Sequence, residues 1–417
     1  MLSVIAIGDE LLIGQVIDTN SGDIARMIAP AGWRLNDVQV VSDKAEDITR
    51  AIDRAFESSN IVITTGGIGP TKDDITKNTL CQYFGGEMIE DAAVLQNVKD
   101  VVERRGIRLN ELTASQAIVP SSCRVIQNRV GTAAIMWFER DGKILVSMPG
   151  VPFETRQMFR EEVFPQLLER FPSDSAIEHR TMLVTGLTES ALAMTLDQWE
   201  NALPEHLHLA YLPKPGLIRL RLDGMHRDKD FLAQDIDRHF AQLAEIIGEN
   251  VLHMSDAEPQ EILLEHLNRL SLTVATAESC TGGNIAHLIT SIAGSSSVFM
   301  GSIVAYSNDV KHRLLGVKSE TLEQHGAVSI PTVEQMAEGA CRSIGTDCSI
   351  ATSGIAGPTG GTPDKPVGTV CIAVKSPLGI VSHTHRFPGD RNRVIECAST
   401  TAIIMLIEQL KRLDNQK

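Results

Sequence analysis

The feature that most constrains the fold of this chain is an apolar run that ends in small, hydroxyl-bearing and glycine residues before a helical pattern. Residues 272–276 are β-prone, and residues 284–292 carry apolar side chains at helical spacing. Between them stands the sequence Glu278-Ser279-Cys280-Thr281-Gly282-Gly283. A strand, a tight turn and a helix in this order place a side chain at a sheet edge and direct free backbone N–H groups at a ligand. Ser279 occupies that turn, although an ordinary strand-to-helix turn with a hydroxyl cap has the same pattern.

Composition restricts the class of protein. The chain has 417 residues, 43% of them hydrophobic, so we expect two or three globular domains. A net charge of −15 argues against nucleic acid as the main partner, because backbone phosphates require a basic face. No apolar run approaches the roughly 18 residues of a membrane span, and the first residues lack a basic leader. Seven cysteines without a CxxC pair suit a reduced compartment. We therefore expect a cytoplasmic protein without a membrane or nucleic-acid partner.

Two strand–loop–helix units define an N-terminal domain, residues 1–170. The strand expected at 4–7 precedes a loop with Gly8 and Gly14, and the strand expected at 61–64 precedes a second glycine-rich loop. Alternating strands and helices predict a parallel sheet covered on both faces, with ligands beyond the carboxyl ends of its strands.

Glycines and carboxylates at these strand ends indicate phosphate chemistry. Backbone N–H groups at glycine loops and helix N-termini bind anions. Carboxylates are ligands that hold Mg²⁺ against a polyphosphate, and a divalent ion activates an attacking water. The expected ligands of this Mg²⁺ or similar ion are Asp9, Glu10, Asp18, Asp73 and Asp74. Taken singly, each acid could instead cap a helix or be solvated.

The motifs of this domain resemble those of a known family. They are Gly8-Asp9-Glu10-Leu11-Leu12, Asp18-Thr19-Asn20-Ser21, Thr65-Gly66-Gly67-Ile68-Gly69-Pro70-Thr71-Lys72-Asp73-Asp74 and Met148-Pro149-Gly150-Val151-Pro152-Phe153-Glu154. The domain resembles the N-terminal domain of CinA proteins, which is similar to the molybdopterin-binding fold of MoaB and MogA. The resemblance implies a three-layer α/β/α domain with metal-dependent ADP-ribose pyrophosphatase activity, or pterin binding as the alternative. The ADP-ribose contacts that it implies are Asn20, Thr65, Gly66, Gly67, Gly69, Thr71, Pro149, Gly150 and Glu154.

Residues 171–252 predict a small α+β connector. We expect a strand at 179–184, a helix at 189–199, a strand pair around 213–216 and a helix at 229–247. The segment resembles the KH-like connector of CinA proteins, but it lacks the GxxG loop with which KH domains clamp RNA. We interpret it as a spacer, and we expect His206 and His208 to be solvated or packed rather than metal ligands.

Residues 253–417 carry chemistry that suits amide hydrolysis, which needs a nucleophile, a base and donors for an oxyanion. Ser279 offers a hydroxyl, and Lys311 follows the strand expected at 299–306. Lys311 can act as a base only if its pKa falls several units from about 10.4. Tyr306 is placed to orient this pair by hydrogen bonding. Cys280 is the rival nucleophile, because thiols are more reactive near neutral pH. His383 and His385 share one face of a strand, but they lack a third metal ligand.

Three motifs make the C-terminal resemblance specific. They are Glu278-Ser279-Cys280-Thr281-Gly282-Gly283, Val304-Ala305-Tyr306-Ser307-Asn308-Asp309-Val310-Lys311 and Ser353-Gly354-Ile355-Ala356-Gly357-Pro358. They resemble PncC, the nicotinamide mononucleotide (NMN) deamidase fused as the C-terminal half of CinA proteins.

This resemblance assigns the nucleophile to Ser279 and implies a second three-layer α/β/α domain. It also implies NMN deamidation without a cofactor, and a homodimer. We expect backbone N–H groups near Gly282, Gly283 and Gly354 to form the oxyanion hole, and Arg391 at a helix start to bind the 5′-phosphate. The expected NMN contacts are Glu278, Thr281, Gly282, Gly283, Asn308, Ser353, Gly354 and Arg391. The alternative from a different class is an adaptor in competence or DNA damage.

Overall fold

The computed structural model describes residues 2–71, 73–172 and 176–415, which fall into two compact units. Residues 1–178 with 224–235 form the first unit, and residues 179–223 with 236–417 form the second. The expected division at residues 170 and 252 is finer than this one and stays a prediction. Within the described residues, no helix combines the length and the apolarity that crossing a membrane requires.

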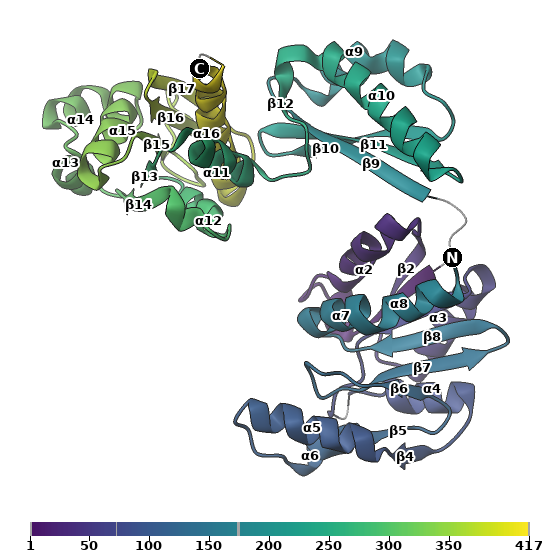
Figure 1. Cartoon of the computed structure of the whole chain (residues 1–417). Helices are drawn as coiled ribbons and strands as arrows, with labels where there is room; N and C mark the ends of the chain where they lie inside the picture. Colours follow the sequence, from purple (N-terminus) through teal and green to yellow (C-terminus); the bar gives the residue numbers. More distant parts are fainter. Residues whose placement is uncertain (1, 72, 173–175, 416–417) are drawn as a thin grey trace. The chain divides into compact units, whose positions relative to one another are not determined.

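A six-stranded sheet with the order β2-β1-β3-β8-β7-β6 forms the centre of the first unit (Figure 1). Its strands are β1 (Leu2–Ile7), β2 (Leu35–Val41), β3 (Ile61–Thr65), β6 (Arg124–Ile126), β7 (Ile135–Arg140) and β8 (Lys143–Met148). Strands β2, β1, β3 and β8 are parallel, as predicted. Strands β7 and β6 are antiparallel to their neighbours, so an antiparallel edge, which the sequence did not predict, extends the predicted parallel sheet. The reason is the tight turn Asp141-Gly142, with φ of 53° and 75°, because a two-residue turn joins only antiparallel strands.

Helices cover both faces of this sheet because strand side chains alternate between the faces. Leu2 and Val4 of β1 pack on one face against α2 (Asn20–Ile28), α7 (Pro152–Met158) and α8 (Phe164–Arg170). On the opposite face, β1 packs against α3 (Ala45–Ser58) and α4 (Thr76–Phe84). The remaining regular elements of this unit are α1 (Asp9–Leu12), β4 (Met88–Glu90), α5 (Ala92–Arg104), α6 (Glu111–Ala114) and β5 (Ile118–Pro120). The three-layer prediction is confirmed.

The connector is a four-stranded sheet with the order β10-β11-β9-β12 and two helices. Its elements are β9 (Ala176–Val184), α9 (Glu189–Asn201), β10 (Leu207–Lys214), β11 (Leu217–His226), α10 (Lys229–Ile247) and β12 (Val251–His253). The predicted strands and helices are confirmed. Lys411 Nζ donates to the carbonyl oxygens of Val251 and Leu252 at 2.9 and 3.0 Å, which ties β12 to the last helix of the chain.

The C-terminal sheet has the order β14-β13-β15-β16-β17. Its strands are β13 (Val274–Glu278), β14 (Phe299–Val304), β15 (Cys348–Gly354), β16 (Thr369–Ser376) and β17 (Gly379–Arg386). Strands β14, β13 and β15 are parallel, whereas β16 and β17 are antiparallel. Helices α11 (Pro259–Leu270), α12 (Asn284–Thr290) and α16 (Arg391–Asp414) cover one face. Helices α13 (Asn308–Leu315), α14 (Ser319–His325) and α15 (Ile330–Ile344) pack on the other.

The position of β13 decides where the turn that carries Ser279 lies. This strand begins and ends two residues later than expected, because its register with β14 and β15 continues to Glu278 opposite Val304 and Thr352. Ser279 therefore follows an inner strand directly. Because β14 ends at Val304, Tyr306 lies beyond the strand rather than at its last position.

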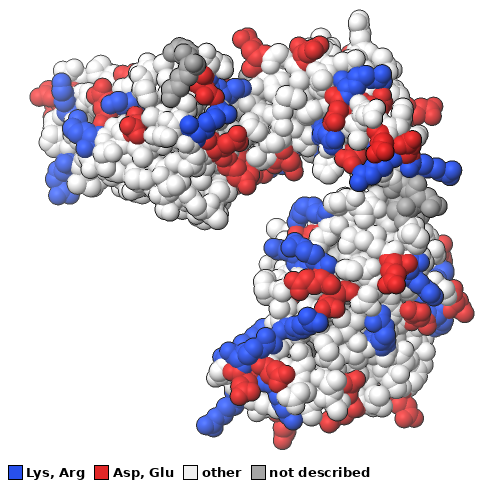
Figure 2. Space-filling model, viewed as in Figure 1, with Lys and Arg blue, Asp and Glu red and all other residues white. Residues whose placement is uncertain are grey.

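Acidic and basic side chains are interspersed within each part of the chain on the face shown in Figure 2. Neither sign forms a continuous field there, which is typical of an ordinary solvated surface.

Candidate functional site

Ser279 and Lys311 meet at the carboxyl end of the C-terminal sheet. Ser279 follows β13, and Lys311 lies on α13, the helix after β14. Lys311 Nζ is 3.1 Å from Ser279 Oγ, and it donates to the Ala305 carbonyl oxygen at 2.9 Å. The Lys311 side chain is 1% exposed, and none of the described carboxylates forms an ion pair with it. Burial lowers the pKa of Lys311, while Cys280 partly opposes this. The lysine is thus shifted toward the neutral amine that a base requires.

The rival nucleophile is held in its unreactive form. Burial raises the pKa of the Cys280 thiol to about 12, and the neighbouring Glu278 charge adds to this. A thiol with that pKa is protonated near neutral pH, whereas the thiolate is the reactive species. The raised pKa of this thiol therefore favours Ser279 over Cys280.

Glu278, which we expected to contact the nucleotide, instead caps helix α12. Its side chain is fully buried, with one carboxylate oxygen accepting from the N–H groups of Gly283 and Ile285 at 3.0 and 3.1 Å. The other oxygen accepts from Ala286 N–H at 2.9 Å. A carboxylate at this place satisfies unpaired helix donors and interacts favourably with the helix dipole. The role of Glu278 is therefore to fix the turn that carries Ser279.

Two of the expected oxyanion donors, the N–H groups of Gly282 and Gly283, are already bonded in this structure. Gly282 N–H donates to the Ser279 carbonyl oxygen at 3.1 Å, and Gly283 N–H is bound to Glu278, so neither is available. The N–H groups of Cys280 and Thr281 have no acceptor within the described part of the chain. These two follow the serine directly, which is where a hydrolase that carries its nucleophile on a strand-to-helix turn has one of its donors.

A cavity of about 240 Å³ opens at the serine–lysine pair. Its wall consists of Ser279, Cys280, Tyr306, Asn308, Lys311, Ala327, Val328, Ser353, Gly354, Ala356 and Arg391. The catalytic set and half of the expected NMN contacts are thus brought together. Glu278, Thr281, Gly282 and Gly283 are not part of this wall. Sequence reasoning missed Ala327 and Val328, which precede α15 and carry no chemical signal.

Tyr306 and Arg391 form a second pair at the mouth of the cavity. Arg391 donates through Nη2 to the Tyr306 hydroxyl at 2.9 Å and through Nη1 to the Gly357 carbonyl at 2.8 Å. In the described residues, Tyr306 has no hydrogen bond to Ser279 or Lys311, so it orients the arginine rather than the catalytic pair. A guanidinium has five N–H donors, which leaves Arg391 with donors for an anion.

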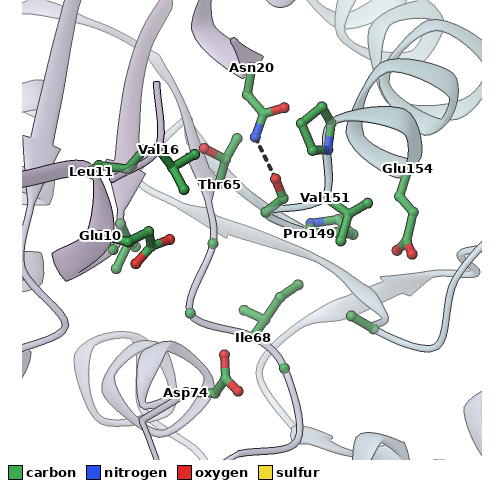
Figure 3. A pocket seen from close by; sticks show the side chains of 18 of the residues that line it. Glu10, Leu11, Val16, Asn20, Thr65, Ile68, Asp74, Pro149, Val151 and Glu154 are labelled. Carbon is green, nitrogen blue, oxygen red and sulfur yellow. Dashed lines mark hydrogen bonds between the residues drawn. The ribbon is translucent and has the colours of Figure 1, made fainter. Parts of the chain in front are cut away.

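A larger cavity, about 490 Å³, lies at the carboxyl ends of the N-terminal strands (Figure 3). All of the residues expected to bind ADP-ribose lie on its wall. Gly66 and Gly67 have φ of 102° and 65°, conformations that side chains rarely adopt. A Cβ at Gly66 would lie 2.2 Å from the Ile7 carbonyl oxygen. This loop therefore depends on glycine for its path along the cavity.

Carboxylates surround this cavity without forming a metal cage. Glu10, Asp18, Asp73 and Asp74 line it as expected, whereas Asp9 does not. Asp43, which the motifs did not predict, lies on the wall. Figure 3 shows Glu10, Asp74 and Glu154 at separate points around the space. The described residues contain no group of three or more His, Cys, Asp and Glu that could hold a metal ion. The pairs His206/His208 and His383/His385 therefore have no third ligand among the described residues.

The charges of these acids nevertheless act on one another. Burial raises the pKa of Asp43, and the charges of Asp9, Glu10 and Asp74 raise it further, against a hydrogen bond from Asp9 N–H. Asp74 also shapes its own loop, because its Oδ2 accepts from the Thr71 N–H and hydroxyl at 2.9 and 2.5 Å. Mg²⁺ is commonly held by one or two carboxylates together with substrate phosphates and water. The donor set fits that mode and not an all-protein site.

The comparisons with known proteins agree along the chain. Residues 3–169 match the family model described as a probable molybdopterin binding domain, residues 179–252 the damage-inducible protein CinA KH domain, and residues 256–410 the CinA C-terminal domain. A CinA-like protein of Flavobacterium psychrophilum is 38% identical over 98% of both chains, and one of Cytophaga hutchinsonii is 40% identical over 98% of both chains. A putative competence-damage inducible protein of Caldicellulosiruptor saccharolyticus is 38% identical over 97% of this chain and 98% of its own.

Proposed function

This chain belongs to the CinA family, and we propose that its C-terminal domain is an amidase that hydrolyses NMN to nicotinate mononucleotide and ammonia. The observation that carries the proposal is the 3.1 Å approach of a buried lysine amine to the Ser279 hydroxyl. An amine without a carboxylate partner in the described residues, and with a lowered pKa, can accept a proton from that hydroxyl.

In the proposed acylation, the Ser279 Oγ–carbon bond forms, the carboxamide C–N bond breaks, and Lys311 carries the proton from the serine to the leaving nitrogen. Lys311 Nζ takes the Ser279 hydroxyl proton as Oγ bonds to the carboxamide carbon, and the C=O electron pair moves to oxygen. The N–H group of Cys280, the residue directly after the serine and part of the cavity wall, would receive that oxyanion. When the C–N bond breaks, the Lys311 ammonium returns its proton to the leaving nitrogen, and ammonia departs.

Deacylation repeats these steps with water. Lys311 takes a proton from water as its oxygen attacks the ester carbon, and Ser279 Oγ leaves and regains a proton. The Ala305 carbonyl supports both halves, because it binds one N–H of the amine and so directs the lone pair toward Ser279. Arg391, presented by Tyr306, would bind the 5′-phosphate of the nucleotide.

Ammonia release from NMN by the purified full-length protein tests this proposal. Wild-type activity that Ser279→Ala removes, with an unchanged melting temperature, supports the serine mechanism. Absence of wild-type activity would overturn the deamidase proposal.

For the N-terminal cavity we propose hydrolysis of ADP-ribose to AMP and ribose 5-phosphate. A water oxygen would bond to one phosphorus as the bridging P–O bond breaks. The observation that favours this is the combination of a glycine loop with mutually repelling carboxylates around one cavity. The loop N–H groups would bind the pyrophosphate. Glu10, Asp18, Asp43, Asp73 and Asp74 are the residues on the cavity wall that would hold a divalent ion, which supplies charge neutralisation and water activation when bound.

Competition separates this proposal from pterin binding, which the molybdopterin-binding match suggests as the alternative. ADP-ribose hydrolysis that AMP inhibits and a pterin phosphate does not inhibit would support the nucleotide. The reverse pattern would support the pterin. Since the relatives' names refer to competence and damage, an adaptor role is the alternative for the whole chain. Full activity of the isolated protein at both cavities would make an adaptor unnecessary to explain its residues.

A further inference from the structure

A buried lysine behind the N-terminal cavity holds a wall residue by both of that residue's carbonyl oxygens. Lys77 Nζ, on α4, donates to the Gln116 backbone oxygen at 3.0 Å and to the Gln116 side-chain oxygen at 2.9 Å. A third, longer bond of 3.4 Å reaches the Ile118 carbonyl. An ammonium has three N–H donors, so these acceptors account for all of them. Burial lowers the pKa of Lys77 to about 8, so the protonated form that makes three bonds persists at neutral pH.

This arrangement fixes which way the Gln116 amide faces. A lysine ammonium donates and cannot accept, so the amide atom next to Lys77 must be the oxygen. The Nε2 group is then the other end. It is buried, the residue is 1% exposed, and Nε2 has no acceptor within the described residues. Gln116 lines the cavity. Buried donors are nearly always paired, so an unpaired donor of a cavity-wall residue is available to bond a water or a ligand atom.

The side-chain amide of Asn20, on the same wall, is held by its nitrogen rather than by its oxygen. Asn20 Nδ2 donates to the Gly150 carbonyl at 2.9 Å (Figure 3), which leaves Asn20 Oδ1 buried and without a donor in the described residues. One amide thus offers a donor and the other an acceptor, each fixed by a bond at its other end. A nucleotide carries acceptor oxygens and ring nitrogens as well as hydroxyl and amino donors, whereas inorganic pyrophosphate is chiefly an acceptor.

We propose that Gln116 is a specificity-determining residue of the N-terminal cavity, whose Nε2–H donates to an acceptor atom of the bound nucleotide, with Lys77 as its positioning residue. The inference rests on the proposed ADP-ribose function and deepens it, because it assigns recognition of the nucleotide to a residue outside the glycine loop and the carboxylates.

The test is the substitution Gln116→Glu, which keeps the shape and the bond to Lys77 but replaces the donor with an acceptor. We expect AMP or ribose 5-phosphate, measured by calorimetric titration of the full-length protein, to bind about 10- to 100-fold more weakly. Whichever product loses affinity identifies the half of ADP-ribose that Gln116 contacts. Gln116→Met, which removes the donor without adding charge, should produce a smaller loss in the same product.

Two controls keep the test decisive. Gln82→Glu makes the same chemical change at an exposed position on α4 and should leave both affinities unchanged. Ammonia release from NMN by the same preparation reports on the integrity of the chain. If wild type hydrolyses ADP-ribose and Gln116→Glu binds both products as wild type does, the Gln116 inference is wrong and the proposed function stands. If wild type neither hydrolyses ADP-ribose nor binds its products, the proposed N-terminal function itself fails.

Discussion

The two cavities of this chain differ in how much of their chemistry is assembled before a ligand arrives. In the C-terminal cavity, the proposed nucleophile Ser279 and the proposed base Lys311 are 3.1 Å apart, and Lys311 is buried. In the N-terminal cavity, the carboxylates lie around the space, and no three of those described form a metal site. Covalent catalysis needs reacting side chains in contact, whereas phosphoryl transfer depends on positioning and charge that the substrate and its cation complete. The difference in geometry therefore suits the two different reaction classes proposed for these cavities.

Charge follows the same division. Burial lowers the pKa of Lys311, and none of the described carboxylates pairs with it to oppose this shift. Asp43 is an acid near three other acids, and this contributes to its raised pKa. The C-terminal cavity favours a neutral amine, and the N-terminal cavity favours a cationic ligand.

We expect the largest effect from a substitution that removes the proposed nucleophile. Ser279→Ala should lower ammonia release from NMN by at least about 10³-fold, because no acyl intermediate can form. ADP-ribose hydrolysis should be unchanged. An ammonia assay and an AMP assay on one preparation provide the measurement. Retained activity in Ser279→Ala together with loss in Cys280→Ala would transfer the nucleophile to the thiol.

Removal of divalent metal should abolish the N-terminal activity and spare the C-terminal one, the reverse of Ser279→Ala. EDTA is expected to reduce ADP-ribose hydrolysis to background and to leave ammonia release intact, since only the carboxylate-lined cavity would use a cation. Excess Mg²⁺ should restore the lost activity. A parallel fall of both activities in EDTA would contradict the division.

The pH profile should identify Lys311 as the base. A protonated amine cannot accept a proton, so kcat/KM for NMN should rise with pH until Lys311 is deprotonated and then level off. The inflection should lie at the lowered pKa of Lys311, below the ordinary 10.5. Lys311→Met should lower the rate by about 10²- to 10⁴-fold and abolish that inflection. Between the folded pKa and 10.5 the unfolded chain binds the extra proton, so Lys311 also makes stability rise with pH in that window. An unchanged inflection in Lys311→Met would assign it to another group.

A smaller effect is expected from the glycine loop. At Gly67, φ is 65° and a Cβ would lie 2.2 Å from Thr76 Oγ1, so Gly67→Ala must shift either the loop or the Thr76 side chain behind it. ADP-ribose hydrolysis should fall by about 10- to 100-fold, since a shift near 1 Å at a phosphate site is enough. Gly106→Ala is the matched control, because Gly106 has the same φ with no atom within 4 Å. Equal losses in the two variants would mean that backbone strain alone, rather than the loop, is responsible.

The smallest expected effect concerns phosphate recognition in the C-terminal cavity. Arg391→Lys should raise KM for NMN about tenfold and change kcat little, because lysine keeps the charge but cannot present two parallel donors. Nicotinamide riboside, which lacks the phosphate, should show no such difference. A similar rise in KM for both substrates would place the phosphate elsewhere.

Features set by local sequence could be predicted. Helix α10 has the expected bounds, and the motifs at the ends of β13, β14 and β15 do meet at one cavity, because parallel strands deliver their carboxyl ends to one edge. Features set by side-chain direction could not. Glu278 belongs to the catalytic motif but turns into the helix, and Asp43 reaches the cavity without any motif. The Asp141-Gly142 dipeptide did carry a usable signal, since it favours the antiparallel turn that the strand pattern alone concealed.

The capping of α12 by Glu278 has an electrostatic consequence for the neighbouring serine. A carboxylate one residue before Ser279 would be the natural counter-ion of Lys311, and such a pair would keep the amine protonated. Three amide N–H groups instead occupy its oxygens, and Glu278 is not among the groups that raise the pKa of Lys311, although Cys280 does experience its charge. The helix start thus holds by hydrogen bonds a carboxylate that could otherwise pair with Lys311 and keep the proposed base protonated.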